Sequence, residues 1–523
     1  MRSPLHVKQT SRGSQIATPA SVPPPVGGWD AVSSLEDMPP NHAPVLDNWF
    51  PSTADVRVRR GFSTHAGNMG TSPVESLMVY QGVTSATSKL FGVTAGNIYD
   101  VTSTADGTLA VGSLTNSRFQ YATFATSGGN FLVIVNGVDA PRNYDGSSWT
   151  TPSITGTGIT AANFINVNIH QSRLWFVIKD SLDAAYLPVS SIAGTAVKYP
   201  LGAIFNKGGY LVAMTTWTHD GGNGPDDYAV FITSQGQVAI YQGTDPSSST
   251  AWALVGVYDL GAPIGYRCFT KVAGDVALVN IDGVLPLSKA LTTDRGAAPG
   301  IAITANINNA MNESARSYKS HFGWSLTPYP RGTMAIMNVP ITENVLQYQY
   351  VMNTLTGAWC RFTGMNANCW AVFNDNLYFG GNDGKVYQAD VGGSDGGNAI
   401  DAVGQTAYNY FRTRGQLKQW SLLQPLLTTD SDGRPAVGIS TDFKDNAVLG
   451  TPTVSIIPSA LYDQALYDTD VYAIEGRTVS DWTTISGIGS CASVHFRAQT
   501  NTAGDSIMRL NGFNALMQRG GVL

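Results

Sequence analysis

The chain has 523 residues, a formal net charge of −6 and only 13% charged residues, about half the usual share. This length exceeds one ordinary core of roughly 100–200 residues, so two domains, or a repeat architecture with an appendix, are expected. The mild negative charge argues against a dedicated duplex-binding face, which would need a basic surface. The 56 glycines show no collagen period and indicate many tight turns.

The cysteine pattern and the leader indicate a protein that is made and kept in a reducing compartment. The cysteines are too far apart for a zinc knuckle and too few for a disulfide framework, so free, buried thiols are expected. They are Cys268, Cys360, Cys369 and Cys491. The start of the chain lacks the apolar segment of roughly 7–15 residues that a secretory signal requires. No apolar run reaches the ~18 residues of a membrane helix. We therefore expect a soluble protein that is synthesised in a cytoplasm and does not insert into membranes.

The first sixty residues divide into two parts. Residues 1–26 are rich in Ser, Thr and Pro, which predicts an extended or disordered arm. Residues 27–61 contain clustered prolines, the box LDNWFP and the alternating run VRVR. Alternation places Arg57 and Arg59 on one face of a strand. That face either meets an acidic partner subunit or is solvated, and we favour the partner because the chain has few other charges.

Residues 62–391 alternate short β runs with Gly, Asn or Asp turns, which is the signature of β-hairpins. The turn glycines are separated by 41, 99, 47 and 101 positions, or one, two, one and two units of about 41–50 residues. They are Gly96, Gly137, Gly236, Gly283 and Gly384. The missing turns are expected at Asp180–Ala184 and Arg331–Gly332. This period predicts a degenerate β-propeller of six or seven blades. A pair of β-sandwiches is the alternative.

The sequence GGSDGGN at 392–398 predicts a flexible break and a domain boundary. Residues 399–523 again alternate and predict a small β-sandwich. Within it, Tyr462, Tyr467 and Tyr472 recur every five residues, which favours packing or an interface over a ligand site. The whole chain is therefore predicted to be all-β, with a propeller and a sandwich-like platform.

Motifs that would carry chemistry are weak. Gly380–Lys385 resembles a phosphate loop that is one residue short, but it lies between two predicted strands, so a hairpin turn is favoured. Asp430–Gly433 begins like an EF-hand loop but lacks the Glu at the twelfth position. His219–Asp227 offers three carboxylates that could hold Ca²⁺, although a flexible loop is the commoner interpretation.

No sequence motif supports a catalytic function. No H-E-x-x-H motif occurs, and no pair of carboxylates stands out as a glycosidase would require. We predict that the protein is not an enzyme, with no catalytic residue, no cofactor and no metal site.

The run LEDMPPNHAPVLDNWFPSTADVRVRRGF resembles the leader of tail proteins of short-tailed bacteriophages. The matching residues are Met38, Pro39, Ala43, Leu46, Asp47, Asn48, Trp49, Phe50, Pro51, Val58, Arg59, Arg60 and Gly61. A second stretch, Asp226–Cys268, is similar to the same family, as are the turn Tyr144–Gly146 and the segment Arg519–Leu523.

The resemblance is to the tail nozzle, or tail tubular protein B type. It implies a homohexameric ring below the head-to-tail adaptor, with needle, fibre or spike proteins as further partners and genomic DNA in transient passage. The location implied is the virion tail. A channel for DNA should be neutral or acidic so that phosphates do not stick by counterion release.

The same resemblance implies that residues 27–62 supply platform strands against the C-terminal sandwich. Trp49 and Phe50 would be buried, and Arg57 and Arg59 would face a neighbour, which makes these four the candidate subunit-interface residues. Two alternatives stay open. A receptor- or glycan-binding propeller would cluster exposed aromatic residues on one loop face. A propeller glycosidase would need convergent carboxylates, one with a raised pKa.

Overall fold

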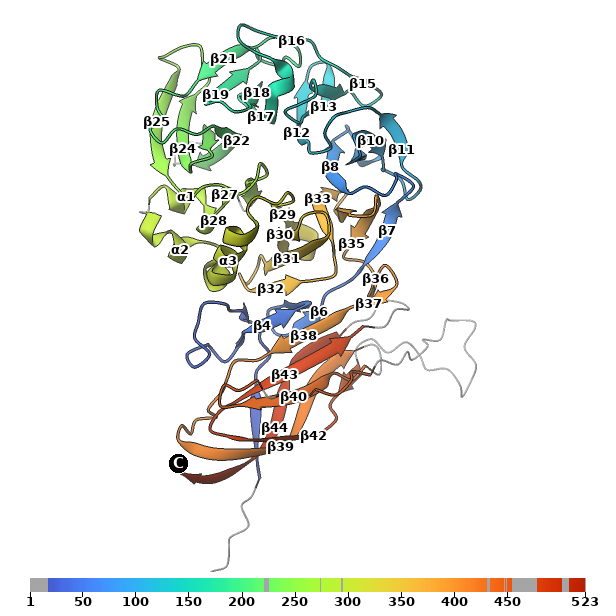
Figure 1. Ribbon diagram of the computed structural model, residues 1–523, viewed down its shortest axis with the longest axis vertical. Coiled ribbons are helices and arrows are strands. Elements are labelled where there is room, and N and C mark those ends of the chain that lie inside the picture. Colours follow the sequence, from blue (N-terminus) through green and yellow to red (C-terminus); the bar gives the residue numbers. More distant parts are fainter. Residues whose placement is uncertain are drawn as a thin grey trace, which may run out of the picture.

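The computed structural model describes residues 17–220, 225–272, 274–292, 295–429, 433–445, 447, 449–453, 477–500 and 508–522. It consists almost entirely of β-strands, arranged as a β-propeller above an elongated platform (Figure 1). The predicted all-β propeller with a sandwich-like platform is therefore confirmed.

Among the described residues, six four-stranded blades and one three-stranded sheet follow one another around the propeller axis. Blade 1 holds β8 (Val74–Tyr80), β9 (Lys89–Thr94), β10 (Asn97–Asp100) and β11 (Thr108–Val111), and blade 2 holds β12 (Gln120–Thr126), β13 (Gly129–Val135), β14 (Arg142–Tyr144) and β15 (Trp149–Thr150). Blade 3 holds β17 (Phe164–His170), β18 (Arg173–Ile178), β19 (Asp183–Tyr186) and β21 (Val197–Pro200), with β16 (Ile154–Thr155) and β20 (Gly194–Thr195) pairing beside it. Blade 4 holds β22 (Leu211–Asp220), β23 (Pro225–Thr233), β24 (Gln237–Gly243) and β25 (Trp252–Asp259).

The remaining sheets lie nearest the platform. Sheet 5 holds β26 (Phe269–Val272), β27 (Asp275–Asn280) and β28 (Gly283–Pro286). Blade 6 holds β29 (Ser325–Tyr329), β30 (Met334–Thr342), β31 (Leu346–Asn353) and β32 (Trp359–Phe362). Blade 7 holds β33 (Ala367–Phe373), β34 (Asn376–Gly381), β35 (Val386–Ala389) and β7 (Phe62–Ala66). Because β7 comes from the N-terminal side, the ring is closed by segments about 330 residues apart in the chain, as the pairing Phe62↔Ala389 shows.

The predicted turn glycines connect the second and third strands of their blades. Each has a positive φ, from 72° at Gly96 to 124° at Gly283, a region that favours glycine. The turn of blade 3 lies at the predicted place, next to Asp180. The turn expected at Arg331–Gly332 was placed wrongly, because those residues join β29 to β30 and the equivalent turn of blade 6 is at Asn344.

The cause of that error is a helical insertion between sheet 5 and blade 6, which breaks the regular spacing of the blades. It contains α1 (Leu287–Ala290), α2 (Ala298–Ile301) and α3 (Asn308–Tyr318). In α3, Met311 and Ala315 are buried one turn apart and face the sheet. The turn signals used to place the blades carry no information on such an insertion.

The platform combines both ends of the described chain. Its seven-stranded sheet holds β41 (Arg477–Val479), β42 (Thr483–Gly489), β39 (Gln416–Thr429), β44 (Met508–Val522), β1 (Thr18–Val22), β6 (Val56–Val58) and β5 (Trp49–Pro51). The facing layer holds β4 (Val45–Asp47), β38 (Asp401–Gln405), β43 (Ala492–Gln499) and β40 (Ala436–Thr441). A short pair, β2 (Gly28–Trp29) and β3 (His42–Ala43), precedes them. The arm predicted over residues 1–26 thus includes a platform strand, β1, while residues 1–16 lie outside the described residues.

The flexible break predicted at 392–398 is wrong. These residues form β36 (Ser394–Asp395) and β37 (Asn398–Ala399), and β36 pairs with β7. The composition is that of a linker, but backbone and carboxylate bonds to the N-terminal segment hold it in place. The predicted aromatic excursion at Tyr462, Tyr467 and Tyr472 lies outside the described residues.

Candidate functional site: the propeller–platform joint

Strand β4 joins the two parts of the molecule. On one side it runs parallel to β32 of blade 6, and on the other it pairs antiparallel with β38 of the platform. An eight-stranded sheet therefore runs without a break from blade 6 into the platform (Figure 1). The joint is built from the LDNWFP box and the segment after it.

Asp47 ties this strand to the propeller through an ion pair. Arg361 of β32 donates from Nε and Nη2 to its two carboxylate oxygens at 2.8 and 2.6 Å. The Arg361 guanidinium also lies over the rings of Trp29 and Tyr348, at 5.7 and 5.4 Å. A bidentate pair of this kind fixes orientation as well as distance.

Asn48 forms hydrogen bonds with three other segments of the chain. Its φ of 59° is left-handed, which Asn tolerates better than most residues. Its side-chain nitrogen donates to Thr363 Oγ1 at 2.9 Å and to the Asp401 carbonyl at 2.8 Å. Its side-chain oxygen accepts from Arg59 Nε at 2.8 Å and from the Thr363 backbone at 2.9 Å. All polar atoms of the side chain are therefore paired within the chain.

Arg59 is an internal residue, and the prediction that it faces a neighbouring subunit is wrong. It is only 2% exposed and forms an ion pair with Asp395. Its other donors reach Asn48 Oδ1, the Thr363 carbonyl and the Arg60 carbonyl. Strand β6 ends at Val58, so Arg59 turns into the joint instead of continuing the alternation.

Trp49 and Phe50 are buried as predicted, at 0% and 1% exposure. Trp49 packs edge-on against Phe496 of β43 at 5.4 Å, and Phe50 contacts Phe362 of blade 6. Both belong to the core of the subunit, so neither presents a surface to a neighbour. Arg57 is only half-buried, with its guanidinium 5.1 Å from the Phe50 ring, and its contact with a neighbour stays a prediction.

Gly61 lets the chain cross against the 392–395 segment. Its N–H donates to the Gly392 carbonyl at 3.0 Å, and its carbonyl accepts from Val391 at 3.1 Å. A Cβ at this position would overlap the carbonyl of Ser394. The run Gly392–Gly396 matches the motif G-x-S-x-G of hydrolases. It lies between short strands instead of between a strand and a helix, so it does not form a nucleophile elbow.

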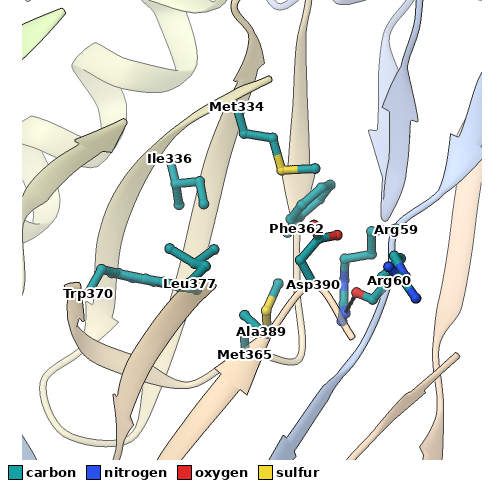
Figure 2. A pocket seen from close by; sticks show the side chains of 10 residues that line it. All are labelled: Arg59, Arg60, Met334, Ile336, Phe362, Met365, Trp370, Leu377, Ala389 and Asp390. Atoms are coloured by element: carbon teal, nitrogen blue, oxygen red, sulfur yellow. Dashed lines mark hydrogen bonds between the residues drawn. The ribbon is translucent and has the colours of Figure 1, made fainter. Parts of the chain in front are cut away.

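A small cavity of about 20 Å³ lies beside the joint, between blades 6 and 7 (Figure 2). Apolar side chains, among them Met334, Phe362 and Trp370, form most of its wall, and Asp390 lies beside Arg59 and Arg60. This volume suits about one water molecule. The cavity therefore fits no substrate.

Asp390 is the polar group of this cavity that is most affected by burial. Burial raises the pKa of its carboxyl, while Arg60, Tyr329, Arg57 and Arg331 act in the opposite direction. Tyr329 donates its hydroxyl to Asp390 Oδ2 at 3.3 Å.

A second polar cluster crosses the propeller axis. Arg267, which precedes β26, donates from Nη2 to Ser76 Oγ in blade 1 at 2.9 Å and to the Phe119 carbonyl at 3.2 Å. Arg118 bonds Glu75 and Glu343, at 3.0 and 2.6 Å. Both guanidinium groups lie over the ring of Phe322. Side chains thus bridge opposite blades across the axis of the single propeller.

The remaining sequence candidates have these outcomes. Gly380–Lys385 is the hairpin turn between β34 and β35, as predicted. Asp430–Gly433 and His219–Asp227 lie partly outside the described residues. In the described part of the chain, no group of three His, Cys, Asp or Glu side chains could hold a metal ion. Within the same part, no helix is long and apolar enough to cross a membrane. The four cysteines are buried and unpaired, as predicted.

Sequence reasoning missed the partners of the joint. They are Arg361, Thr363, Asp395 and Asp401, which lie more than 300 positions from Asp47, Asn48 and Arg59. No local pattern marks them, and Asp395 was hidden in the run that was interpreted as a linker.

Comparisons with known proteins were made for sequence and for structure. No model of a protein family matches the chain, and no curated protein matches it. One similar solved structure is BBS1N in complex with ARL6DN, with 9% identity and a TM-score of 0.38, covering 64% of this chain and 98% of that one. Another is the extracellular domain of the one-component system BT4673 from B. thetaiotaomicron, with 9% identity and a TM-score of 0.39, covering 84% of this chain and 62% of that one.

Proposed function

We propose that this chain is a structural virion protein, the tail nozzle of a short-tailed bacteriophage. Six copies would form a ring that extends the DNA-ejection channel below the head-to-tail adaptor. One observation carries the proposal. The residues on which the family resemblance rests, among them Asp47, Asn48, Trp49, Arg59 and Gly61, are those that build the propeller–platform joint.

The mechanical properties of the joint suit a ring subunit. Domains linked by a short polar interface normally move relative to each other. Here a continuous sheet, a buried Arg59–Asp395 pair and a common core hold the propeller at one angle to the platform. A ring of such subunits would project its propellers in a fixed direction.

The charge and surface of the chain agree with passage of DNA. The net charge of −6 disfavours retention of phosphates by counterion release. In this proposal the protein has no catalytic role, is synthesised in the host cytoplasm and resides in the virion tail. Its partners are the adaptor and the needle, fibre or spike proteins.

Receptor binding by the propeller is less well supported. Among the described residues, two exposed aromatic side chains lie in the propeller, Tyr121 and Tyr266, and two in the platform, Phe443 and Trp482. The propeller thus offers two exposed aromatic rings among the described residues.

Cryo-electron microscopy of particles that contain the chain tests the proposal. We expect six copies in a ring around an axial channel beneath the connector. A peripheral position, or a three-fold spike, would show that the chain is a receptor-binding subunit instead.

A further inference from the structure

The outer strands of the propeller sheets differ in how far the rest of the chain covers them. Strands β32 and β7 are covered by β4 and β36. The edge of β28 is covered by the helical insertion, where Val284 donates its N–H to Thr304 Oγ1 at 3.1 Å and its carbonyl accepts from the Ile303 backbone at 2.8 Å. The outer strands of sheet 5, blade 6 and blade 7 are therefore closed by other parts of the same chain.

Two further outer strands are protected in other ways. In blade 2, β15 has only two residues. In blade 3, β21 carries Lys198, which is exposed and paired with Asp183, and Pro200, which has no backbone N–H. Short strands, lysines and prolines are common protections of sheet edges. This leaves β11 of blade 1 and β25 of blade 4.

These two outer strands, which we call the blade 1 rim (β11) and the blade 4 rim (β25), expose apolar side chains. In the blade 1 rim, with the sequence TLAV, Leu109 is 58% exposed. In the blade 4 rim, with the sequence WALVGVYD, Leu254 and Val255 are 42% and 49% exposed, and the charged residue Asp259 comes at the end. Within the described residues, neither strand has a partner on its outer side.

A β-bulge in each rim decides what kind of contact it can make. Ala110 is the extra residue of β11, and Val255 is the extra residue of β25. A bulge interrupts the regular spacing of backbone groups, so it disfavours a continuous ladder to another strand. The contact that suits these rims is therefore one between apolar side chains.

The two rims lie on opposite sides of the propeller. Blades 2 and 3 separate them on the far side from the platform, and Figure 1 shows β11 at the right and β25 at the left. A head-to-tail ring needs two different complementary surfaces on each subunit, whereas a two-fold dimer uses one surface that contacts itself. Two apolar rims on opposite sides meet the requirement of a ring.

We propose that the blade 4 rim, around Leu254 and Val255, packs against the blade 1 rim, around Leu109, of the next copy of this chain. The inference rests on the proposed ring and places a contact between neighbouring propellers. Such a contact removes exposed apolar surface from water, which favours association. The partner follows from the comparison of the outer strands. In the part of the chain that the structure describes, no other outer strand longer than two residues is both uncovered and free of Lys and Pro.

Cysteine cross-linking tests which rims meet. Subunits carrying Leu109→Cys are mixed with subunits carrying Leu254→Cys and treated with the short thiol cross-linker bismaleimidoethane over a range of protein concentration. The four native cysteines are buried, so wild-type protein gives a low background. In the control mixture, Val197→Cys replaces Leu254→Cys, because Val197 of β21 is also exposed, at 47%. Denaturing gels count the linked subunits, and urea unfolding shows whether each variant is folded.

We expect linked dimers in the mixture of Leu109→Cys and Leu254→Cys, and at least tenfold fewer in the control mixture and in either variant alone. The double variant Leu109→Cys/Leu254→Cys should give a ladder of up to six linked subunits. Linking no stronger than in wild type would overturn the inference, as would equal linking in the control mixture.

Linked dimers of Leu254→Cys alone would also overturn the inference, because they require a symmetric contact between two blade 4 rims. The position of the chain in the particle decides the nozzle assignment separately. A peripheral position would refute the nozzle but leave a cross-linked contact between the two rims in place.

Discussion

Blades 6 and 7 and blades 3 and 4 have the same strand plan but are stabilised differently. On the side of the propeller nearest the platform (the near side), β32 pairs with β4, and β7 pairs with β36. The outer strands of blades 6 and 7 therefore continue into further strands. On the far side, β21 and β25 have no outer partner among the described residues. Both sides contain packed aromatic rings and ion pairs. The ion pairs of the near side, Arg361–Asp47 and Arg59–Asp395, link the propeller to the N-terminal segment and the platform, whereas those of the far side, such as Arg173–Asp245, stay within blades 3 and 4.

The two sides of the propeller therefore have different structural roles. The aromatic contacts of blades 3 and 4 lie inside the propeller, so they stabilise the circle of blades without fixing its angle to anything outside it. Bidentate ion pairs and a continuous sheet fix direction. The near side therefore orients the propeller, and the far side completes it.

Removing one tryptophan from each side should separate the two roles. Trp49→Ala and Trp175→Ala should each cost about 3–5 kcal/mol, since both side chains are fully buried. Hydrogen exchange should rise in the platform and in blades 6 and 7 for Trp49→Ala, but only in blades 3 and 4 for Trp175→Ala. Equal exchange patterns in the two variants would remove the distinction between the sides.

The Arg59–Asp395 pair should show the cost of leaving a charge alone in the joint. In Arg59→Met the carboxylate of Asp395, which is 12% exposed, loses its partner, and we expect a loss of about 3 kcal/mol in urea unfolding. The double variant Arg59→Met/Asp395→Leu should recover part of this loss. Arg57→Met is the control and should cost less than about 1 kcal/mol. An equal effect of the two single arginine variants would contradict the structure.

Acid should weaken the far side through His170. Burial lowers the pKa of His170 from 6.5 to about 4. Below about pH 6.5 the unfolded chain binds a proton at His170, whereas the folded chain binds it only near pH 4. The free energy of unfolding therefore falls as the pH drops from about 6.5 to about 4. The full contribution is on the order of 3 kcal/mol. Tryptophan fluorescence in urea at several pH values should show a smaller loss for His170→Gln, and an unchanged pH profile would count against the burial of this ring.

The smallest effect is expected at an exposed pair of the platform. Arg497 and Asp401 form a bidentate pair at 2.7 and 3.0 Å, but their side chains are 40% and 43% exposed. Arg497→Met should therefore cost less than about 1 kcal/mol, compared with a clearly larger cost for Arg361→Met, whose guanidinium packs on two rings. Urea unfolding of the two variants side by side checks the difference.

Local chemistry explains which parts of this fold were predictable. A turn that needs a positive φ favours glycine, so Gly96, Gly137 and Gly384 predicted the positions of their blades correctly. The burial of Trp49 and Phe50 followed from a family resemblance and was right.

No local sequence pattern predicts the ion pairs of the joint. Arg59 and Asp395 are 336 positions apart, and nothing near either residue indicates the other. Alternation predicted the same environment for Arg57 and Arg59, although the strand ends between them. A linker-like composition also says little about backbone bonds made to a distant segment, as those of Gly61 to 391–392 show.

The pairing of β1 with β44 has a consequence for how the protein is made. Thr18 bonds the Met517 carbonyl across a sequence separation of 499 residues. At about 5–20 residues per second, a ribosome needs roughly 25–100 s to synthesise that interval. Strands β1 and β6 must wait that long for β44, whereas β7 can close the ring of blades as soon as β35 has been made. Folding of the platform should therefore finish only after translation of β44, later than closure of the propeller.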